Sequence, residues 1–126
     1  MSHLFVYGTL MRGEERDGFV NHLEARQASI MGRLWRAPAG YPALELTDRG
    51  IPIAGEILAL DTPSILIALD LIEGVSQGLY NRVQATVQTE NGHEMAWVYV
   101  MNATQLRQAS CTPLKGNDWR KFRRRR

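Results

Sequence analysis

An α+β domain with a small mixed, mainly antiparallel, barrel-like sheet is the fold class that the sequence predicts. Three observations support this class. Short apolar and β-branched runs recur along the chain, whereas clear helical periodicity appears at residues 62–74. The Asn91-Gly92 pair predicts a hairpin turn between strands over 82–88 and 95–101. With 126 residues and no internal repeat or linker, the chain has the length of one domain.

The first expected element is a short buried strand. Leu4-Phe5-Val6-Tyr7 is an apolar and aromatic run that stops at Gly8-Thr9, which is typical of a strand entering a tight loop. The residues that follow are mostly polar or charged as far as Asp17. The apolar positions within 19–25 then predict a short amphipathic helix.

Two further strands are expected in the first half of the chain. Residues 28–35 form one of them, and Gly32 within it allows another backbone to approach closely. Turn-forming residues predict a loop over 38–42. The β-branched and apolar stretch 53–60, around Gly55, is the candidate central strand.

The clearest helix begins at Thr62-Pro63. Thr62 is a candidate N-cap, and Pro63 suits the first helical position, where no amide donor is needed. Apolar residues then recur at helical spacing up to Ile72, and Gly74 is the expected stop.

The charge distribution separates a mildly acidic body from a basic end. The net charge is +2 and the isoelectric point is about 9.0, yet from Lys115 onward the chain carries seven basic side chains against one aspartate. We place the domain over 1–122 and a basic C-terminal tail over 123–126. Nucleic-acid modules spread basic residues over a folded face with aromatic platforms, and this body does neither. Nucleic acid is therefore not an expected partner, and binding of the tail to polyanions is the weaker alternative.

Several other classes are excluded by what the sequence lacks. No apolar run approaches the ~20 residues that span a bilayer, and the first residues do not resemble a signal peptide. Cys111 is the single cysteine, so no intrachain disulfide forms and a cytoplasmic location is expected. No His, Cys and carboxylate cluster has metal-ligand spacing, and no phosphate-binding glycine loop carries a lysine. We expect neither a metal nor a cofactor.

Two segments offer polar groups for ligand binding. The strand that stops at Gly8 leaves consecutive backbone amides, which can surround an anion or an oxyanion, although an ordinary turn explains the same residues. Further along, Tyr80 offers a hydroxyl on an apolar body, and Arg82 offers a fork for a carboxylate. Ordinary core and surface roles explain these two residues equally well.

Glu73 is the candidate proton carrier. It follows the apolar stripe of the predicted helix at its last turn, where the negative end of the helix dipole disfavours a carboxylate. Partial burial also opposes ionisation, so both effects raise its pKa toward a range useful for acid/base catalysis. A solvated helix-end residue is the plainer alternative. Asp70, three positions earlier, is expected to be a surface or capping partner.

Seven motifs, taken together and in order, resemble the γ-glutamylcyclotransferase-like superfamily, which includes γ-glutamylamine cyclotransferases and AIG2-like proteins. They span almost the whole chain before the arginine tail. The motifs are Val6-Tyr7-Gly8-Thr9-Leu10, Tyr41-Pro42-Ala43-Leu44, Gly55-Glu56-Ile57-Leu58, Leu69-Asp70-Leu71-Ile72-Glu73-Gly74, Tyr80-Asn81-Arg82, Ala96-Trp97-Val98-Tyr99-Val100 and Gly116-Asn117-Asp118-Trp119.

The resemblance implies a small β-barrel flanked by helices, with a pocket at the end of the barrel. It implies release of 5-oxoproline from γ-glutamyl amides, without metal or cofactor. The family's catalytic glutamate aligns with Glu73 and its substrate-binding loop with residues 7–10. The expected substrate-binding residues are thus Tyr7, Gly8, Thr9 and Leu10, together with Tyr80.

Two other functions stay open at this point. One is a binding module that keeps the pocket without turnover, and the other is a cyclotransferase acting on a different aminoacyl substrate. The leaving amine and the oligomeric state are also open. We expect the loops around 12–16 and 36–41 to shape the leaving-amine side of the pocket.

Overall fold

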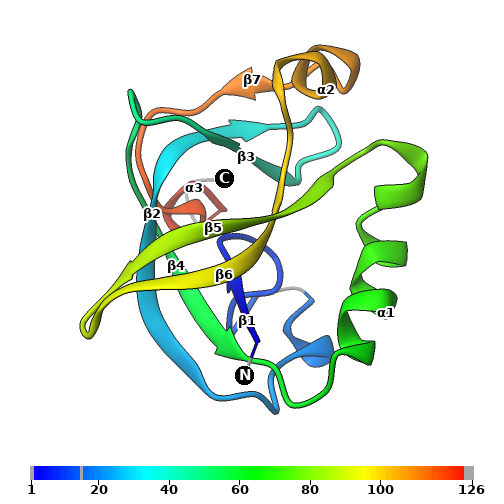
Figure 1. Cartoon of the computed structure of the whole chain (residues 1–126). Coiled ribbons are helices and arrows are strands. Elements are labelled where there is room, and N and C mark those ends of the chain that lie inside the picture. The colour runs from blue at the N-terminus through cyan, green and yellow to red at the C-terminus, as the bar shows by residue number, and fades with distance from the viewer. Residues whose placement is uncertain (1, 15, 124–126) are drawn as a thin grey trace.

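Seven strands form one sheet in the structure, a computed structural model that describes residues 2–14 and 16–123. The strands are β1 (His3–Val6), β2 (Ala25–Arg36), β3 (Pro42–Leu46), β4 (Ile51–Ala59), β5 (Asn81–Thr89), β6 (Gly92–Val100) and β7 (Thr112–Pro113). Six of them follow the order β3-β2-β4-β1-β6-β5, and β2 also pairs with β5. This pairing closes five strands into a barrel, while β3 and β7 extend the sheet from β2 (Figure 1).

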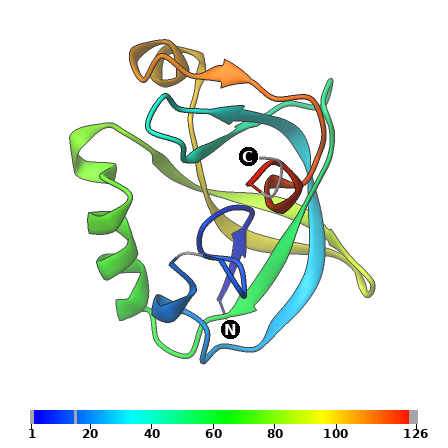
Figure 2. The same cartoon turned by 180° about the vertical axis from the view of Figure 1, so that it is seen from behind.

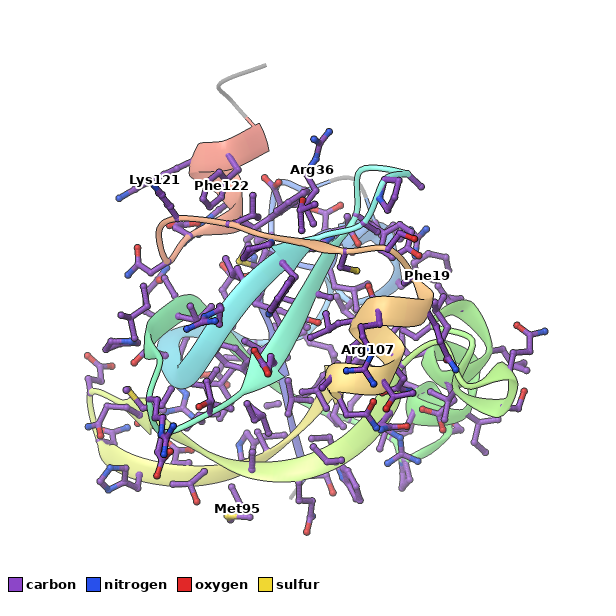
Figure 3. The ribbon with its side chains drawn as sticks, turned by 90° about the horizontal axis from the view of Figure 1, so that it is seen from above. Phe19, Arg36, Met95, Arg107, Lys121 and Phe122 are labelled. Atoms are coloured by element: carbon purple, nitrogen blue, oxygen red, sulfur yellow. The ribbon has the colours of Figure 1, made fainter. Side chains whose placement is uncertain are left out.

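The barrel is mixed and mainly antiparallel. Of the pairings between the described strands, β1 with β6 is parallel and the others are antiparallel. The helices α1 (Ser64–Ile72) and α2 (Ala103–Gln108) lie outside the barrel (Figure 2), and α3 (Trp119–Arg123) lies at the edge of the molecule (Figure 3). The predicted fold class, a small barrel flanked by helices, is confirmed. None of the helices in the described part of the chain is long and apolar enough to cross a membrane.

The predicted N-terminal strand is confirmed as β1, and it lies in the middle of the barrel wall. It pairs with β4 on one side and β6 on the other, and the side chains of Leu4 and Phe5 are buried. Because both edges of β1 are paired, the strand holds the loop that follows it in a defined position.

The expectation that another backbone approaches Gly32 closely is confirmed. A Cβ at Gly32 would lie 2.6 Å from the carbonyl oxygen of Glu45 on β3.

The prediction of an amphipathic helix over 19–25 is wrong. The segment forms a short 3-10 helix at Asp17–Phe19 and a turn, and β2 begins at Ala25. Val20 and Leu23 are buried, but Phe19 is half exposed and lies at the periphery of the molecule (Figure 3). The apolar residues therefore do not form one buried face of a helix. Val20 and Leu23 are buried because the turn that carries them packs against the core.

The helix expected from Thr62 is confirmed as α1, although its start differs from the expectation. The helix begins at Ser64, and the Thr62 hydroxyl caps no amide but lies 3.1 Å from the Ser64 hydroxyl. Pro63 precedes the helix with helical dihedral angles. The expected stop is confirmed, because Glu73 is the C-terminal cap and Gly74 follows with a φ of +65°.

Some elements have no counterpart in the prediction. β3 starts within the expected loop, and α2, β7 and α3 follow the last predicted strand. The basic tail expected over 123–126 begins at the last residue of α3, and residues 124–126 lie outside the part of the chain that the structure describes.

The predicted hairpin is confirmed, with Glu90 and Asn91 in its turn and Gly92 opening β6 with a φ of +101°. We expect Gly92→Val to cost about 1–3 kcal/mol, because a β-branched residue is strained at this φ. The melting temperature should fall by several degrees. KM should stay unchanged, because the turn lies on the opposite side of the molecule from α1, the helix that ends at the predicted site residue Glu73 (Figure 1).

Glu90→Val is the matched control, because Glu90 is exposed and does not have a positive φ. Thermal unfolding of both variants, measured beside their steady-state kinetics, checks this expectation. A large change of KM in a Gly92→Val protein of unchanged stability would contradict it.

Candidate active site

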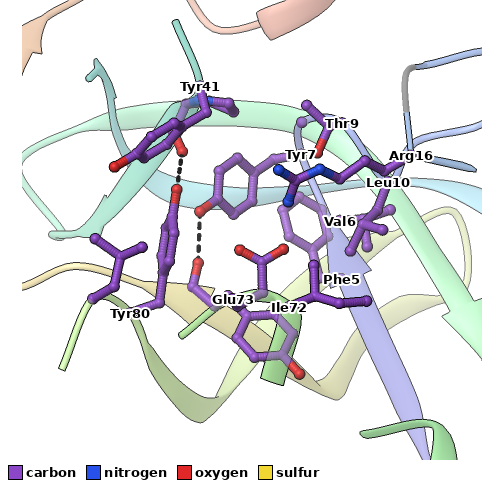
Figure 4. A pocket seen from close by; sticks show the side chains of 14 residues that line it. Phe5, Val6, Tyr7, Thr9, Leu10, Arg16, Tyr41, Ile72, Glu73 and Tyr80 are labelled. Carbon is purple, nitrogen blue, oxygen red and sulfur yellow. Dashed lines mark hydrogen bonds between the residues drawn. The ribbon is translucent and has the colours of Figure 1, made fainter. Parts of the chain in front are cut away.

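A small cavity of about 90 Å³ brings together segments that are far apart in the sequence (Figure 4). It lies between the loop after β1, the end of α1 and the residues before β5. All six residues predicted for the site line this cavity: Tyr7, Gly8, Thr9, Leu10, Glu73 and Tyr80. Their roles stay predictions, but they meet in one place.

The loop after β1 carries backbone amides without acceptors. It turns tightly, because the amide of Met11 donates to the carbonyl of Gly8 at 3.0 Å. Within the described part of the chain, the amides of Gly8, Thr9 and Leu10 donate to no protein atom. Amides in a largely buried loop normally find a partner, so three unpaired ones beside a cavity are suited to an anionic group of a ligand.

Gly8 permits close contact between this loop and β3. A Cβ at Gly8 would lie 2.5 Å from Cγ of Pro42, the first residue of β3. The carbonyl of Pro42 also accepts a hydrogen bond from the Tyr80 hydroxyl. Gly8, Pro42 and Tyr80 are therefore packed as one wall, and a side chain at Gly8 would move the other two.

Tyrosines form the walls of the cavity, and their hydroxyls are tied to the backbone (Figure 4). Tyr7 donates to the carbonyl of Tyr99 at 2.6 Å, and Tyr80 donates to that of Pro42. Burial, and to a smaller extent charge interactions that include Glu73, raise the pKa of both Tyr7 and Tyr80. Both stay protonated, and with the hydrogen already donated each oxygen is left as an acceptor.

Glu73 points into the cavity from the C-terminal end of α1 (Figure 4). Burial raises the pKa of its carboxyl group, and the positive charge of Arg16 lowers it in part. No described residue donates a hydrogen bond to the carboxylate. A partly buried, unpaired carboxylate is costly for stability, and such groups are concentrated at functional sites.

Asp70 is not the surface or capping partner that we expected. Its carboxylate accepts two hydrogen bonds from Arg82, at 2.7 and 3.1 Å, and one from the Tyr99 hydroxyl at 2.8 Å. Arg82 in turn lies over the ring of Trp97. Burial opposes ionisation of Asp70, but the hydrogen bonds from Arg82 and Tyr99 keep its pKa below the ordinary value. Arg82 is thereby engaged within the chain, and Asp70 fixes α1 to β5 and β6.

We expect Asp70→Asn to lower stability by about 1–2 kcal/mol, because Arg82 would lose its ionic partner. The melting temperature should fall by several degrees. kcat/KM should fall less than tenfold, since the helix is loosened while Glu73 remains. Tyr99→Phe, which removes only the hydrogen bond from the Tyr99 hydroxyl, should have a smaller effect on stability and on kcat/KM. Unchanged stability in Asp70→Asn would show that this network does not hold the helix.

Outside this cavity, the described residues form no metal-binding cluster, and the single cysteine is not activated. Among the described residues, no three His, Cys, Asp or Glu side chains are grouped so as to bind a metal ion. The expectation of a metal-free site stays a prediction, which dialysis against EDTA tests. Cys111 is partly buried, and burial raises the pKa of its thiol. A protonated thiol is a poor nucleophile.

Three polar residues that line the cavity were not predicted individually from the sequence: Arg16, Tyr41 and Tyr99. Arg16 and Tyr41 fall within the two loops that were expected to shape the leaving-amine side. The ring of Tyr41 packs against that of Tyr80, with centroids 6.2 Å apart. Tyr99 takes part through its carbonyl as well as its hydroxyl, and no local sequence signal marks such a role.

A barrel with one unpaired carboxylate in a tyrosine-walled cavity is an arrangement suited to acid/base enzymes. Residues 4–121 match the family model described as "Gamma-glutamyl cyclotransferase, AIG2-like". The chain therefore belongs to this family of cyclotransferase enzymes.

Individual proteins are similar to this chain in sequence or in fold. The γ-L-glutamyl-butirosin B γ-glutamyl cyclotransferase of Niallia circulans is 30% identical over 129 residues, which cover 98% of this chain and 78% of that protein. YkqA of Bacillus subtilis has a similar structure, with a TM-score of 0.76 and 28% identity, and the match spans 97% of this chain but 40% of YkqA. An AIG2-like protein from mouse matches in fold with a TM-score of 0.74 and 24% identity, covering 94% of this chain and 87% of its own.

Proposed function

We propose that this protein releases 5-oxoproline and a free amine from a γ-glutamyl amine or amide by intramolecular aminolysis. The observation that carries the proposal is the unpaired carboxylate of Glu73, which shares a small cavity with the unpaired amides of the loop after β1. Membership in a γ-glutamyl cyclotransferase family supports the same substrate class.

The reaction needs little from the protein beyond positioning and proton transfer. The α-amine of the γ-glutamyl group attacks its own γ-carbonyl carbon, so a C–N bond forms and closes a five-membered ring. The bond from that carbon to the leaving nitrogen then breaks. Because both reacting groups belong to one molecule, binding the substrate in a folded conformation supplies much of the rate enhancement.

Glu73 is assigned both proton transfers. Its carboxylate takes a proton from the attacking amine and later gives it to the leaving nitrogen, so the carboxylate is restored at the end of the cycle. General acid/base catalysis of this kind contributes about 10²–10⁴-fold. The burial that raises the pKa of Glu73 makes the group a better base and keeps its proton available for the second transfer.

The remaining groups suit the charged parts of the substrate. The amides of Gly8, Thr9 and Leu10 are suited to the α-carboxylate or to the oxyanion of the tetrahedral intermediate. The hydroxyl oxygens of Tyr7 and Tyr80 have already donated their hydrogens, so they can accept one from the substrate's α-amine. Binding of an anionic group and proton transfer are thus assigned to different sides of the cavity.

The raised pKa of Glu73 predicts the acid limb of the pH profile. The base must be ionised in the free enzyme, so kcat/KM should fall as the pH drops through this pKa. The midpoint should lie above 4.5, the ordinary value for a glutamate. Arg16→Gln should move it higher, because the charge of Arg16 lowers the pKa. A limb at or below the ordinary value would mean that Glu73 is not the titrating base.

A substrate panel tests the proposed function. The purified protein is incubated with γ-glutamyl amino acids and γ-glutamyl-lysine, and 5-oxoproline is measured by chromatography. We expect 5-oxoproline from at least one member, with an equal amount of free amine. Binding of these compounds without product would instead identify a non-catalytic binding module. Cyclisation of only another aminoacyl group would identify a cyclotransferase with a different substrate class.

A further inference from the structure

Arg16 stands at the rim of the cavity and is exposed to solvent. Its amide donates to the carbonyl of Thr9 at 2.7 Å, which fixes its backbone beside the loop that carries the unpaired amides. From there the side chain extends over the cavity, with the guanidinium on the side of Tyr7 and Glu73 (Figure 4). The fold therefore sets the position of the Arg16 backbone, and the side chain reaches the cavity from there.

The guanidinium of Arg16 makes no hydrogen bond or ion pair with the described residues. Other arginines are engaged within the protein, and the described arginines that are not engaged do not line the cavity, unlike Arg16. Arg26, Arg82 and Arg120 pair with carboxylates of the protein, and Arg12 donates to the carbonyl of Leu23. The charge of Arg16 acts on Glu73 across the cavity without a direct bond. A guanidinium with unused donors at the mouth of a site is a binding group for an anion of the ligand.

The arrangement of the cavity indicates which anion this is. The ring-forming end of a γ-glutamyl substrate must lie deep, where its amine reaches Glu73 and its carboxylate or oxyanion reaches the amides of residues 8–10. The cavity opens to solvent beside Arg16, whose side chain is exposed. The leaving amine and its substituent therefore extend toward the rim, where Arg16 lies.

We infer that Arg16 binds a carboxylate carried by the leaving amine, and so selects leaving amines that are themselves amino acids. This rests on the proposed function. A guanidinium binds a carboxylate through two parallel hydrogen bonds, which fixes orientation as well as charge. The interaction is partly exposed to solvent, so we expect an effect of roughly tenfold on kcat/KM, expressed mainly in KM.

A matched pair of substrates isolates this carboxylate. γ-Glutamyl-ethylamine is γ-glutamyl-alanine without the carboxylate of its alanine, and γ-glutamyl-alaninamide keeps the size but not the charge. The wild-type protein should prefer γ-glutamyl-alanine to both, roughly tenfold in kcat/KM. Arg16→Gln should lose this preference, through a loss on γ-glutamyl-alanine and a change within about twofold on γ-glutamyl-ethylamine. Each protein is assayed at a pH on the plateau of its own profile, so that any shift in the pKa of Glu73 does not enter the comparison.

Two further variants test charge and geometry. Arg16→Lys keeps the charge but not the planar fork, and should fall between the wild type and Arg16→Gln. Arg33→Gln removes the same charge from an exposed position of β2 that does not line the cavity, and should leave the preference unchanged. An equal loss on all substrates in Arg16→Gln would mean that Arg16 binds the glutamyl part, and would overturn the inference. Unchanged kinetics would overturn it as well.

Binding measurements separate this inference from the proposed function. Dissociation constants of the same compounds are measured by calorimetry, which does not require turnover. If no 5-oxoproline forms but Arg16→Gln selectively weakens γ-glutamyl-alanine, the proposed function fails and the subsite for the carboxylate stands. If binding shows no dependence on this carboxylate, the inference fails whatever the outcome of the turnover assay.

Discussion

Glu73→Gln should lose about 10²–10⁴-fold in kcat, the range that general acid/base catalysis contributes. Glutamine keeps the shape and hydrogen-bonding capacity of the side chain but cannot exchange a proton at neutral pH. KM should change little, because the loop after β1 is assigned most of the recognition. Stability should not fall and should even rise slightly, since an unpaired, partly buried carboxylate is removed. Steady-state kinetics and thermal unfolding of the same preparation check both expectations.

Comparison with neighbouring carboxylates decides the assignment. Glu73→Asp retains the carboxylate but withdraws it by about one methylene, so its kcat should lie between the wild type and Glu73→Gln. Asp70→Asn should retain most of its kcat but lose stability, the reverse pattern. A nearly active Glu73→Gln beside an inactive Asp70→Asn would move the proton transfer to Asp70. If both variants stay active, Glu56 and Tyr80 are the next candidates.

Those two residues are less suited to proton transfer than Glu73. The carboxylate of Glu56 accepts a hydrogen bond from the amide of Arg12 at 2.8 Å, and Glu56 does not line the cavity. The hydroxyl of Tyr80 donates its hydrogen to the carbonyl of Pro42. Burial also raises the pKa of Tyr80 far above the working range of an enzyme at neutral pH. Glu73 combines access to the cavity with a free carboxylate.

Gly8→Ala should lower kcat/KM by about 10²-fold, the second largest loss that we expect. The added methyl group would overlap the ring of Pro42, which lies 2.5 Å from its ideal position. Either the loop or the start of β3 must shift, and displacements of about 1 Å in a catalytic geometry cost on the order of 10²-fold. The shift would also reach Tyr80 through its hydrogen bond to Pro42.

Gly18→Ala is the matched control for this variant. Gly18 follows in the same N-terminal region, has no atom within 4 Å of an added Cβ, and does not have a positive φ. Its kinetics should equal those of the wild type. Gly8→Ala should show the loss mainly in kcat/KM at a stability lowered by about 1–3 kcal/mol, the usual range for overpacking. Wild-type kinetics in Gly8→Ala would mean that the geometry of this loop is not used in catalysis.

The parts of the site that could be predicted are those encoded by local signals. The strand that ends at Gly8 and the helix that ends at Gly74 are short-range features. In each case the glycine permits the backbone conformation that ends the element, so the neighbouring sequence is enough to predict it. The resemblance to a family added what these signals lack, namely that Glu73 and the loop meet. Local chemistry alone left the plainer interpretation of Glu73 open, because burial of one side chain depends on the whole fold.

The features that could not be predicted depend on contacts between distant segments. The hydrogen bonds from Arg82 to Asp70 join β5 to α1, and Arg82 lies opposite Tyr99, the other donor to Asp70, because β5 pairs with β6. The role inferred for Arg16 depends on its place over the cavity, and no local sequence signal shows that place. One missed element did have a local signal: Asn102 and Gln105 form a capping box at the start of α2, a pattern that is legible in the sequence.

The source of the oxygen in the product tests the central claim most directly. If the substrate's own amine is the nucleophile, the reaction in water labelled with oxygen-18 should yield unlabelled 5-oxoproline and an equal amount of free amine. The carbonyl oxygen then comes entirely from the substrate, and water takes no part in bond formation. Mass spectrometry of the products after one extended incubation gives the answer. Glutamate carrying one oxygen-18 atom, in place of 5-oxoproline, would show that water is the nucleophile and would contradict intramolecular aminolysis.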